Sequence, residues 1–261
     1  MHMVLYGFWQ AIKYRLGFGR AFLYEIIAST LWFFIGAAGF WVILSRFGSI
    51  GGWNTQEVFL MYAGGNVVSG IGSGFFWRGN EAVGWMITTG FIDLYLTKPV
   101  DPYSGFIAGN VNPASLPRLF LNIALMIYCL GLLPVPAPFF KVVLFVIALL
   151  GGMMLCAAMN TACGALAWRV PRGEFSMRVV DALSEVSAYP IHIYPRVLQV
   201  VSTFVLPFAL TNYYPTRYLI RGDVPGGGWL MVGTFVLGLV LFIGSYKLWM
   251  AGLEHYQSTG S

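Results

Sequence analysis

Residues that could carry catalysis are few and widely separated in this chain. Its three histidines are His2, His192 and His255, and its three cysteines all fall inside apolar stretches. A nucleophile with its base, or a metal site, needs such residues at close and regular spacing. The chain also lacks the GxxxxGK[ST] phosphate-binding loop and has no Gly-Lys dipeptide. The residues therefore predict no catalytic group, no metal site and no cofactor bound by this chain.

Ionisable residues are nearly absent from the apolar stretches, although proton-coupled transport would place them at mid-membrane depth. Glu25 is the exception. It lies within about two helical turns of Arg20, so its carboxylate could reach the headgroups of the inner leaflet. We expect this position for Glu25 and leave a functional role open.

Uncharged polar residues and glycines recur inside the apolar stretches, most densely in the second one. Gly70 and Gly74 form a GxxxG pair, which allows two helix backbones to approach closely. The polar side chains either pack helices together within one subunit or line a substrate cavity, and the pattern leaves both interpretations open. The candidates for a substrate pathway are Asn66, Ser69, Ser73, Asn160, Thr161, Gln199, Ser202 and Thr203.

Aromatic and proline residues gather late in the chain, between positions 207 and 218. Tyrosine is enriched at membrane–water interfaces, so an ordinary aromatic belt is one interpretation. The other is a gate at an outer exit, because prolines bracket a rigid turn there. The candidates for this gate are Pro207, Asn212, Tyr213, Tyr214 and Pro215.

The elements that must position these residues are long apolar segments. Hydrophobic residues make up 58% of the 261 residues and charged residues only 10%, too little polar surface for a soluble globule. A bilayer core of about 30 Å requires roughly 20 apolar residues per helix. We expect an all-α integral membrane protein, a single transmembrane domain over residues 1–261 with six transmembrane helices. The expected spans are 21–44, 58–77, 116–133, 142–168, 197–212 and 229–250.

The distribution of Lys and Arg predicts the orientation of these spans. The first apolar stretch is too long for a signal-peptide core, so we expect it to be retained. Most basic residues precede the first span, follow the second and fourth, or end the chain, whereas Arg46, Lys141, Arg217 and Arg221 fall on the other side. The positive-inside rule then places both termini in the cytoplasm. Because the basic residues are scattered, the net charge of +5 does not indicate a nucleic-acid partner.

The expected cytoplasmic loop after the second span contains a short amphipathic segment. Asn80 can cap a helix there and Glu81 suits its positive N-terminal end. Gly90 would end this helix. The apolar face consists of Val83, Trp85, Met86 and Ile87. Such a helix either lies on the membrane surface or docks another protein, and amphipathicity alone does not choose between them.

Two further amphipathic segments and one irregular span are expected. Phe8–Leu23 reads as a basic helix along the inner leaflet before the first span. Arg169–Pro195 reads as a second cytoplasmic amphipathic element. Prolines crowd the fifth span, so we expect it to be broken or partly re-entrant.

Several of these segments together resemble a known family. The residues are Glu81, Trp85, Ile87, Gly90, Ile92-Asp93, Leu96 and Lys98-Pro99 in the second loop, then Tyr189-Pro190-Ile191, Tyr194-Pro195, Phe204, Pro207-Phe208-Ala209, Asn212-Tyr213-Tyr214-Pro215 and the terminal His255-Tyr256-Gln257-Ser258. This pattern, over essentially the whole chain, resembles the six-span permeases of the ABC-2 type ATP-binding-cassette exporters. The subgroup it resembles commonly comprises multidrug or viologen-type cation exporters.

The resemblance implies partners and a role for the second loop. It implies a second permease copy or a related permease, membrane lipid, and two separate ATPase subunits that bind ATP and Mg²⁺. It implies export of a hydrophobic or cationic, drug-like or lipid-like substrate from a bacterium across its plasma (inner) membrane. A coupling helix that contacts the ATPase would correspond to Asn80–Thr88, with Gly90, Asp93, Lys98 and Pro99 shaping the chain that follows.

Two other classes of function could be carried by a chain of apolar helices. A secondary transporter or channel would not use ATP. The scarcity of charged residues deep in the apolar stretches argues against this class, and so does the lack of a convincing inverted repeat. An intramembrane enzyme would need a carboxylate, histidine or metal cluster at matched depth, and the sequence presents none. Transport that persists without ATP in proteoliposomes would favour the secondary transporter or channel.

Overall fold

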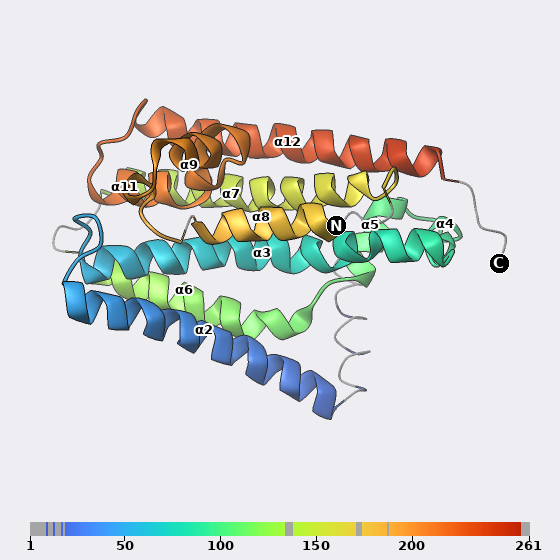
Figure 1. The fold of residues 1–261 in the computed structure, drawn as a ribbon, viewed down its shortest axis with the longest axis horizontal. Helices are drawn as coiled ribbons and strands as arrows, with labels where there is room; N and C mark the ends of the chain where they lie inside the picture. Colours follow the sequence, from blue (N-terminus) through green and yellow to red (C-terminus); the bar gives the residue numbers. More distant parts are fainter. Residues whose placement is uncertain are drawn as a thin grey trace.

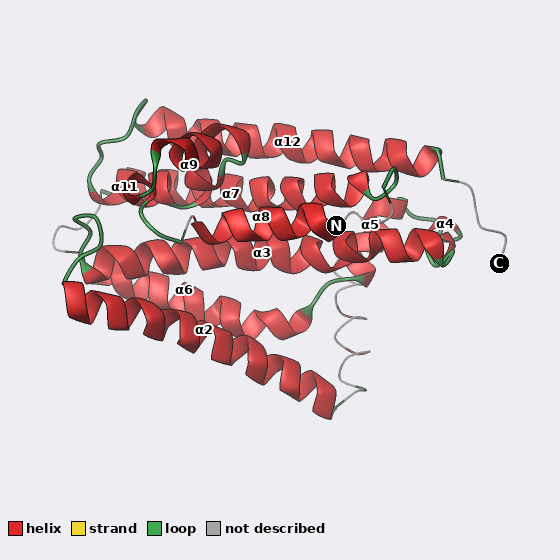
Figure 2. Ribbon diagram, in the orientation of Figure 1, coloured by secondary structure: helices red, strands yellow, loops and turns green. Residues whose placement is uncertain are grey.

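The long helices of this chain run along one common axis (Figure 1). The computed structural model describes residues 19–133, 138–170, 174–186 and 188–256, together with residues 9, 13 and 17. The side chains of Ser73, Glu174, Phe175, Ser176, Leu183, Glu185 and Val186 lie outside this description. Throughout the described ranges the backbone forms helices and loops without a β-strand (Figure 2).

The longer described helices have the following bounds. They are α2 (Arg20–Phe47), α3 (Thr55–Thr88), α6 (Leu116–Gly131), α7 (Phe139–Leu166), α8 (Glu174–Val186) and α12 (Gly228–Glu254). The shorter elements are α4 (Asp93–Leu96), α5 (Pro102–Gly109), η1 (Pro113–Ser115), η2 (Ile191–Ile193), α9 (Arg196–Val200), η3 (Val201–Val205), α10 (Phe208–Thr211) and α11 (Tyr213–Ile220). We call the end of the bundle where α2 ends and α3 begins the distal end, and the opposite end the proximal end.

Length and composition mark four described helices as able to cross a membrane. These are α2, α6 with the preceding η1, α7 and α12. Helix α3 would be a fifth span if its two halves, Thr55–Gly72 and Gly74–Thr88, act as one span with a 49° bend. The observed architecture is thus an all-helical one with apolar helices of membrane-crossing length, as expected, whereas the count of six spans stays a prediction.

Helix α7 is the centre of the bundle because small residues allow its neighbours to approach. A Cβ atom at Gly151 would lie 2.5 Å from the Cα atom of Phe235 in α12. A Cβ atom at Gly72 of α3 would lie 2.5 Å from the Cβ atom of Cys156 in α7. Small residues are the usual means of close helix packing in membranes, where burial of apolar surface drives little association. The glycines of α3 and α7 therefore serve helix packing at these two positions.

The start of α3 is well defined, and it corrects one sequence-based prediction. Asn54 and Glu57 form a capping box, in which Glu57 N donates to Asn54 Oδ1 at 2.9 Å and Asn54 N donates to Glu57 Oε2 at 2.8 Å. The expected cap at Asn80 is wrong, since Asn80 lies inside α3 and its Nδ2 donates to the carbonyl oxygen of Phe76 at 2.7 Å. An asparagine within a helix can bond backward in this way instead of starting a helix.

The segment expected to form a separate interfacial helix, Asn80–Thr88, is instead the last part of α3. It stays helical because Val83 and Met86 are buried in a core at the proximal end, so tertiary packing extends the helix. The expected end is confirmed, because α3 stops at Thr88 and Gly90 follows with a φ of +72°, which glycine adopts readily.

Helix α8 also lies elsewhere than predicted. The sequence predicts a second cytoplasmic amphipathic element over Arg169–Pro195, and α8, which lies within these residues, packs along α3 and α7 (Figure 1). Met177 and Val180 are buried in the core between these helices. The hydrophobic periodicity predicts that one face of this helix is apolar. Both a membrane surface and a helix bundle can bury such a face.

The expected span 197–212 is broken, as its prolines predicted. Helix α9 continues into the π-helical turn η3, which ends at Val205, and α10 begins after Pro207. Proline lacks the N–H group that would continue the helix. The expected N-terminal helix Phe8–Leu23 falls mostly outside the described residues, and α2 begins at Arg20.

Candidate functional site

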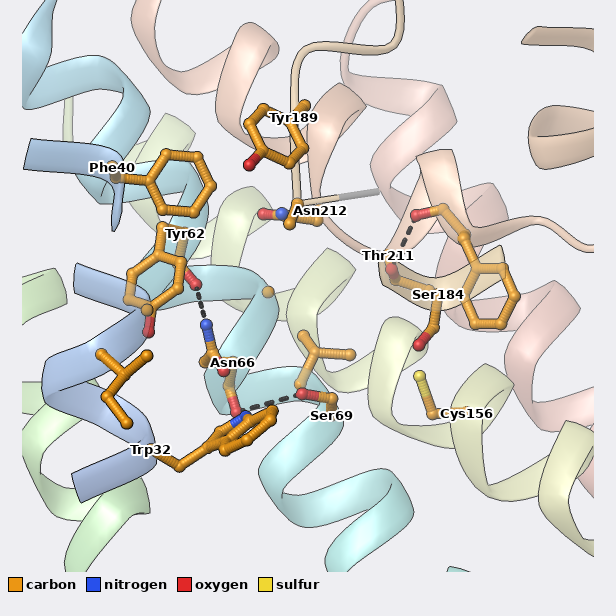
Figure 3. A pocket seen from close by; sticks show the side chains of 16 residues that line it. Trp32, Phe40, Tyr62, Asn66, Ser69, Cys156, Ser184, Tyr189, Thr211 and Asn212 are labelled. Carbon is orange, nitrogen blue, oxygen red and sulfur yellow. Dashed lines mark hydrogen bonds between the residues drawn. The ribbon is translucent and has the colours of Figure 1, made fainter. Parts of the chain in front are cut away.

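A cavity of about 340 Å³ lies among α2, α3, α7, α8 and α10. Figure 3 shows sixteen side chains around it. Its polar lining comprises Tyr62, Asn66, Ser69, Ser184, Tyr189, Thr211 and Asn212, and its large apolar lining comprises Trp32, Ile35, Phe40 and Phe208. None of the lining side chains is charged. A concave, mostly apolar site with a few polar groups is the usual form of a small-molecule site.

Hydrogen bonds to the backbone orient the polar side chains of this cavity. Asn66 Nδ2 donates to the carbonyl oxygen of Tyr62 at 2.8 Å (Figure 3). The hydroxyl of Tyr62 donates to the carbonyl oxygen of Phe33 at 3.3 Å. Asn66 Oδ1 accepts no hydrogen bond within the described part of the chain. The cavity thus presents an amide oxygen as an acceptor beside aromatic rings.

Two glycines make room for the cavity. A Cβ atom at Gly65 would lie 2.5 Å from Asn212 Nδ2, and one at Gly36 would lie 3.1 Å from Cζ of Tyr62. Asn212 and Tyr62 therefore reach the cavity wall only because α3 and α2 carry no side chain at these two positions.

An ionisable side chain lies close to the cavity on α8. Asp181 accepts a hydrogen bond from the indole Nε1 of Trp77 at 2.8 Å, which joins α8 to α3. Ser184, which lines the cavity, donates to the carbonyl oxygen of Asp181 at 2.7 Å. Ionisable residues close to a cavity are candidates for a functional site. Asp181 is such a candidate, and sequence analysis missed it.

Replacing Trp77 with phenylalanine should weaken the attachment of α8. Phenylalanine keeps an aromatic ring but lacks the donor to Asp181, and a typical hydrogen bond contributes about 0.5–1.5 kcal/mol. We expect a lower unfolding midpoint for Trp77→Phe in detergent. Trp41→Phe is the matched control, because Trp41 is 61% exposed. Equal midpoints for both variants would show that this hydrogen bond does not hold α8.

An apolar patch is exposed at the proximal end of α3 and on the turn that follows. It consists of Trp85, Phe91, Leu94 and Leu96, and we call it the proximal patch. The ring centroids of Trp85 and Phe91 lie 5.6 Å apart. Trp85 is 55% exposed, although Val83 and Met86 beside it are buried. An exposed group of large apolar residues marks a contact surface for protein or membrane.

A rigid aromatic core supports the proximal patch. Trp249 of α12 is fully buried, and the centroid of its ring lies 5.1 Å from that of Tyr103 in α5. The hydroxyl of Tyr103 lies 2.6 Å from Thr161 Oγ1 of α7. Burial alone would raise the pKa of Asp101, but hydrogen bonds from Ser104 and Tyr246 outweigh it and hold that pKa below its ordinary value. Helices α5, α7 and α12 are therefore tied together directly behind the patch.

Comparison with protein families decides what kind of protein carries this site. Residues 20–260 match the family described as ABC-2 family transporter protein. The chain belongs to this family. ABC-2 transporter proteins are generally the membrane permeases of ATP-binding-cassette exporters, without an ATPase site of their own, and they work with ATP-binding partner subunits. No curated protein matches the chain in a sequence search.

In this ABC-2 transporter protein, the cavity gathers only part of the predicted substrate pathway. Asn66 and Ser69 line it. The side chain of Ser73 is outside the described part, and Asn160 and Thr161 are buried within α7 away from the cavity lining. The remaining candidates belong to α9 and η3 and are also absent from the lining. They are Gln199, Ser202 and Thr203.

The five candidates for an outer gate do come together at the distal end of the transporter. Pro207 precedes α10, Asn212 lines the cavity, and Tyr213 is buried at the start of α11. Tyr214 and Pro215 lie in the first turn of α11, and the rings of Tyr213 and Tyr214 are 5.2 Å apart. Their role as a gate stays a prediction.

The residues predicted to couple to an ATPase divide into an inner and an outer group. Asn80, Val83 and Met86 are buried, and Ile87 and Asp93 are partly buried. Glu81, Trp85, Lys98 and Pro99 are exposed, and Gly90 forms the turn between α3 and α4. Only the outer group and the proximal patch are open to a partner of the transporter.

The sequence did not predict several of the residues that line the cavity. They are Trp32, Phe40, Tyr62, Ser184, Tyr189 and Thr211. The first three lie among many similar aromatic residues in apolar helices, so their composition carries no distinguishing signal. Ser184 could have been found if the polar stripe of α8 had been interpreted as a face inside the bundle.

Proposed function

We propose that this chain is the permease subunit of a six-span exporter in the bacterial inner membrane, with both termini in the cytoplasm. The proximal end would then face the cytoplasm and the distal end the exterior. The uncharged cavity bounded by α2, α3 and α8 in an ABC-2 transporter protein is the observation that carries this proposal.

The substrate class follows from the cavity lining. Aromatic rings and neutral amides suit a hydrophobic or amphipathic molecule, and they would not compensate a fully buried charge. Asp181 lies one helical turn from the cavity residue Ser184, so a cationic group on a drug-like or lipid-like substrate could be neutralised there. We propose export of such a molecule, driven by ATP and Mg²⁺ bound to the partner subunits.

A second permease would cover the exposed face of α8. Arg178 is exposed on this helix, one turn from Asp181. An exposed helix face that carries a charged side chain suits contact with protein better than contact with lipid. We propose that a second copy or a related permease covers this face, leaving a water-accessible path between the two subunits.

Reconstitution with its partner tests the proposed function. The permease alone should hydrolyse no ATP, whereas co-expression with its ATPase subunits should give vanadate-sensitive hydrolysis and ATP-dependent export in proteoliposomes. Transport that persists without ATP would instead favour a secondary transporter. Failure to co-purify any ATPase subunit would count against the exporter assignment.

Two predicted pathway residues, one in the cavity lining and one outside it, test whether the cavity receives the substrate. Asn66→Leu removes the amide but keeps a similar volume, and we expect transport to fall by about tenfold, because polar recognition in a closed site is worth about 1–3 kcal/mol. Thr203→Val is the matched control, since Thr203 only donates to the carbonyl oxygen of Gln199. Equal transport by both variants would exclude the cavity as the substrate site.

A further inference from the structure

A chain of hydrogen bonds at the distal end joins three segments that are far apart in the sequence. The ring Nε2 of His192 in η2 lies 2.8 Å from the carbonyl oxygen of Gly51 in the α2–α3 turn. The other ring nitrogen, Nδ1, lies 3.3 Å from the hydroxyl of Tyr213 in α11. Arg217 Nη1 donates to the same hydroxyl at 3.1 Å. The imidazole thus bridges the turn and α11.

A second connection runs from α11 to the same turn. Arg221 Nη2 donates to the carbonyl oxygen of Gly52 at 2.8 Å and lies 3.3 Å from Glu57 Oε2. Its guanidinium stacks 4.8 Å from the ring of Trp53, which is fully buried. We call His192, Tyr213, Arg217, Arg221 and turn residues 51–53 the distal clamp.

The distal clamp specifies one neutral tautomer of His192. A carbonyl oxygen only accepts hydrogen bonds, so Nε2 must carry the proton that is donated to Gly51. The unprotonated Nδ1 can then accept from the Tyr213 hydroxyl, and that hydroxyl accepts from Arg217. Every donor in this chain meets an acceptor only while His192 is neutral.

The segments held by the clamp are also walls of the cavity. Tyr189 lines the cavity three residues before His192, and Asn212 lines it directly before Tyr213. Figure 3 shows Tyr189 and Asn212 beside Phe40, at the same side of the cavity. Moving η2 or α11 away from the α2–α3 turn would therefore move two cavity walls.

We propose that the distal clamp is a proton-sensitive latch over the cavity, closed while His192 is neutral and loosened when its imidazole takes up a proton. The regulatory role of the latch rests on the proposed function, because it requires that the cavity receives the substrate. The latch itself depends only on the geometry of the clamp.

The charged groups on the elements around His192 are paired with one another. Hydrogen bonds from Arg217 lower the pKa of Asp223, and the same bonds raise the pKa of Arg217, so this pair stays ionised in mild acid. Glu57 is paired with Arg221. Burial raises the pKa of Tyr194, which keeps its phenol neutral. Histidine is the side chain that ordinarily changes charge between about pH 5 and 8.

Protonation opposes the clamp in two ways. A proton on Nδ1 removes the acceptor that the Tyr213 hydroxyl uses, so one hydrogen bond loses its donor–acceptor match. It also places an imidazolium and the Arg217 guanidinium on opposite sides of one hydroxyl oxygen, and like charges repel. His192 is exposed, so the proton can reach it from solvent.

Hydrogen exchange of the purified full-length chain in nanodiscs tests the latch without any transport assay. After correction for intrinsic exchange rates, amides of residues 48–58 and 188–194 should exchange about threefold to tenfold faster at about pH 5.5 than at about pH 8, the effect of losing one hydrogen bond. His192→Gln should abolish this pH dependence. His255→Gln should retain it, because His255 bonds only to its own helix at Ala251.

A second variant tests the latch if the first does not fold. If His192→Gln does not fold, Tyr213→Phe replaces it, and this variant should exchange at the fast rate at both pH values. Equal corrected exchange of the wild type at both pH values, or a pH dependence that survives in His192→Gln, would overturn the latch. A pH-dependent clamp in a chain that fails to pair with any ATPase would refute only the proposed function.

Discussion

Replacing Gly151 with alanine is expected to separate the two most extensively packed helices of this protein, α7 and α12. The added Cβ would lie 2.5 Å from Cα and 2.6 Å from N of Phe235, which are backbone atoms and cannot rotate away. Overpacking of this kind costs typically about 1–3 kcal/mol. For a chain of this size we expect the unfolding midpoint to fall by roughly 2–4 °C per kcal/mol.

The control for this prediction lies on the same helix pair. Gly244 of α12 has open space where a Cβ would be, so Gly244→Ala adds no clash. Alanine is also favoured over glycine in a helix by up to about 1 kcal/mol. Thermal unfolding in detergent should therefore leave Gly244→Ala at or above the wild type. If Gly151→Ala unfolds at the temperature of Gly244→Ala, the close α7–α12 contact is not what holds these helices.

Trp85→Ala is expected to have the largest effect on coupling to the ATPase. Its side chain is 55% exposed in the proximal patch, while the adjacent proximal core is formed by other residues. The fold should therefore tolerate the change. An interface tryptophan that acts as a hot spot contributes about 2 kcal/mol or more, which corresponds to roughly a thirtyfold loss of affinity. We expect such a loss in ATPase binding, with a parallel loss of coupled hydrolysis.

A tryptophan at the other end of the molecule provides the comparison. Trp229 is 83% exposed at the distal start of α12, so Trp229→Ala removes a similar amount of exposed apolar surface. Titration of the purified permease with its ATPase subunit should detect weaker binding for Trp85→Ala alone. Unchanged affinity in Trp85→Ala would place the docking surface elsewhere.

Local rules predicted those features that depend on neighbouring residues in the chain. Gly90 ends α3 because a residue with positive φ is needed there, and Pro207 interrupts the segment between η3 and α10. The apolar stretches predicted α2, α6, α7 and α12 within a few residues. Each of these features is encoded within one or two helical turns.

The same rules failed where contacts with residues far away in the sequence decide the structure of a segment. Asn80 has the residue type of a helix cap, yet it lies inside α3 because Val83 and Met86 pack into the proximal core. Helix α8 has the period of a surface helix, yet Met177 and Val180 pack between α3 and α7. Periodicity identifies the apolar face of a helix and says nothing of what covers it.

By itself the sequence determined that this chain is an apolar, all-helical membrane protein without a P-loop ATPase site, and its motifs indicated the ABC-2 family. Tertiary structure alone decided which polar groups meet. The cavity residues Tyr62, Ser184 and Asn212, and the clamp residues His192 and Arg217, come from different helices or loops. Their meeting depends on glycines that let α2, α3, α7 and α12 approach, and close approach is a property of paired helices that no single segment encodes.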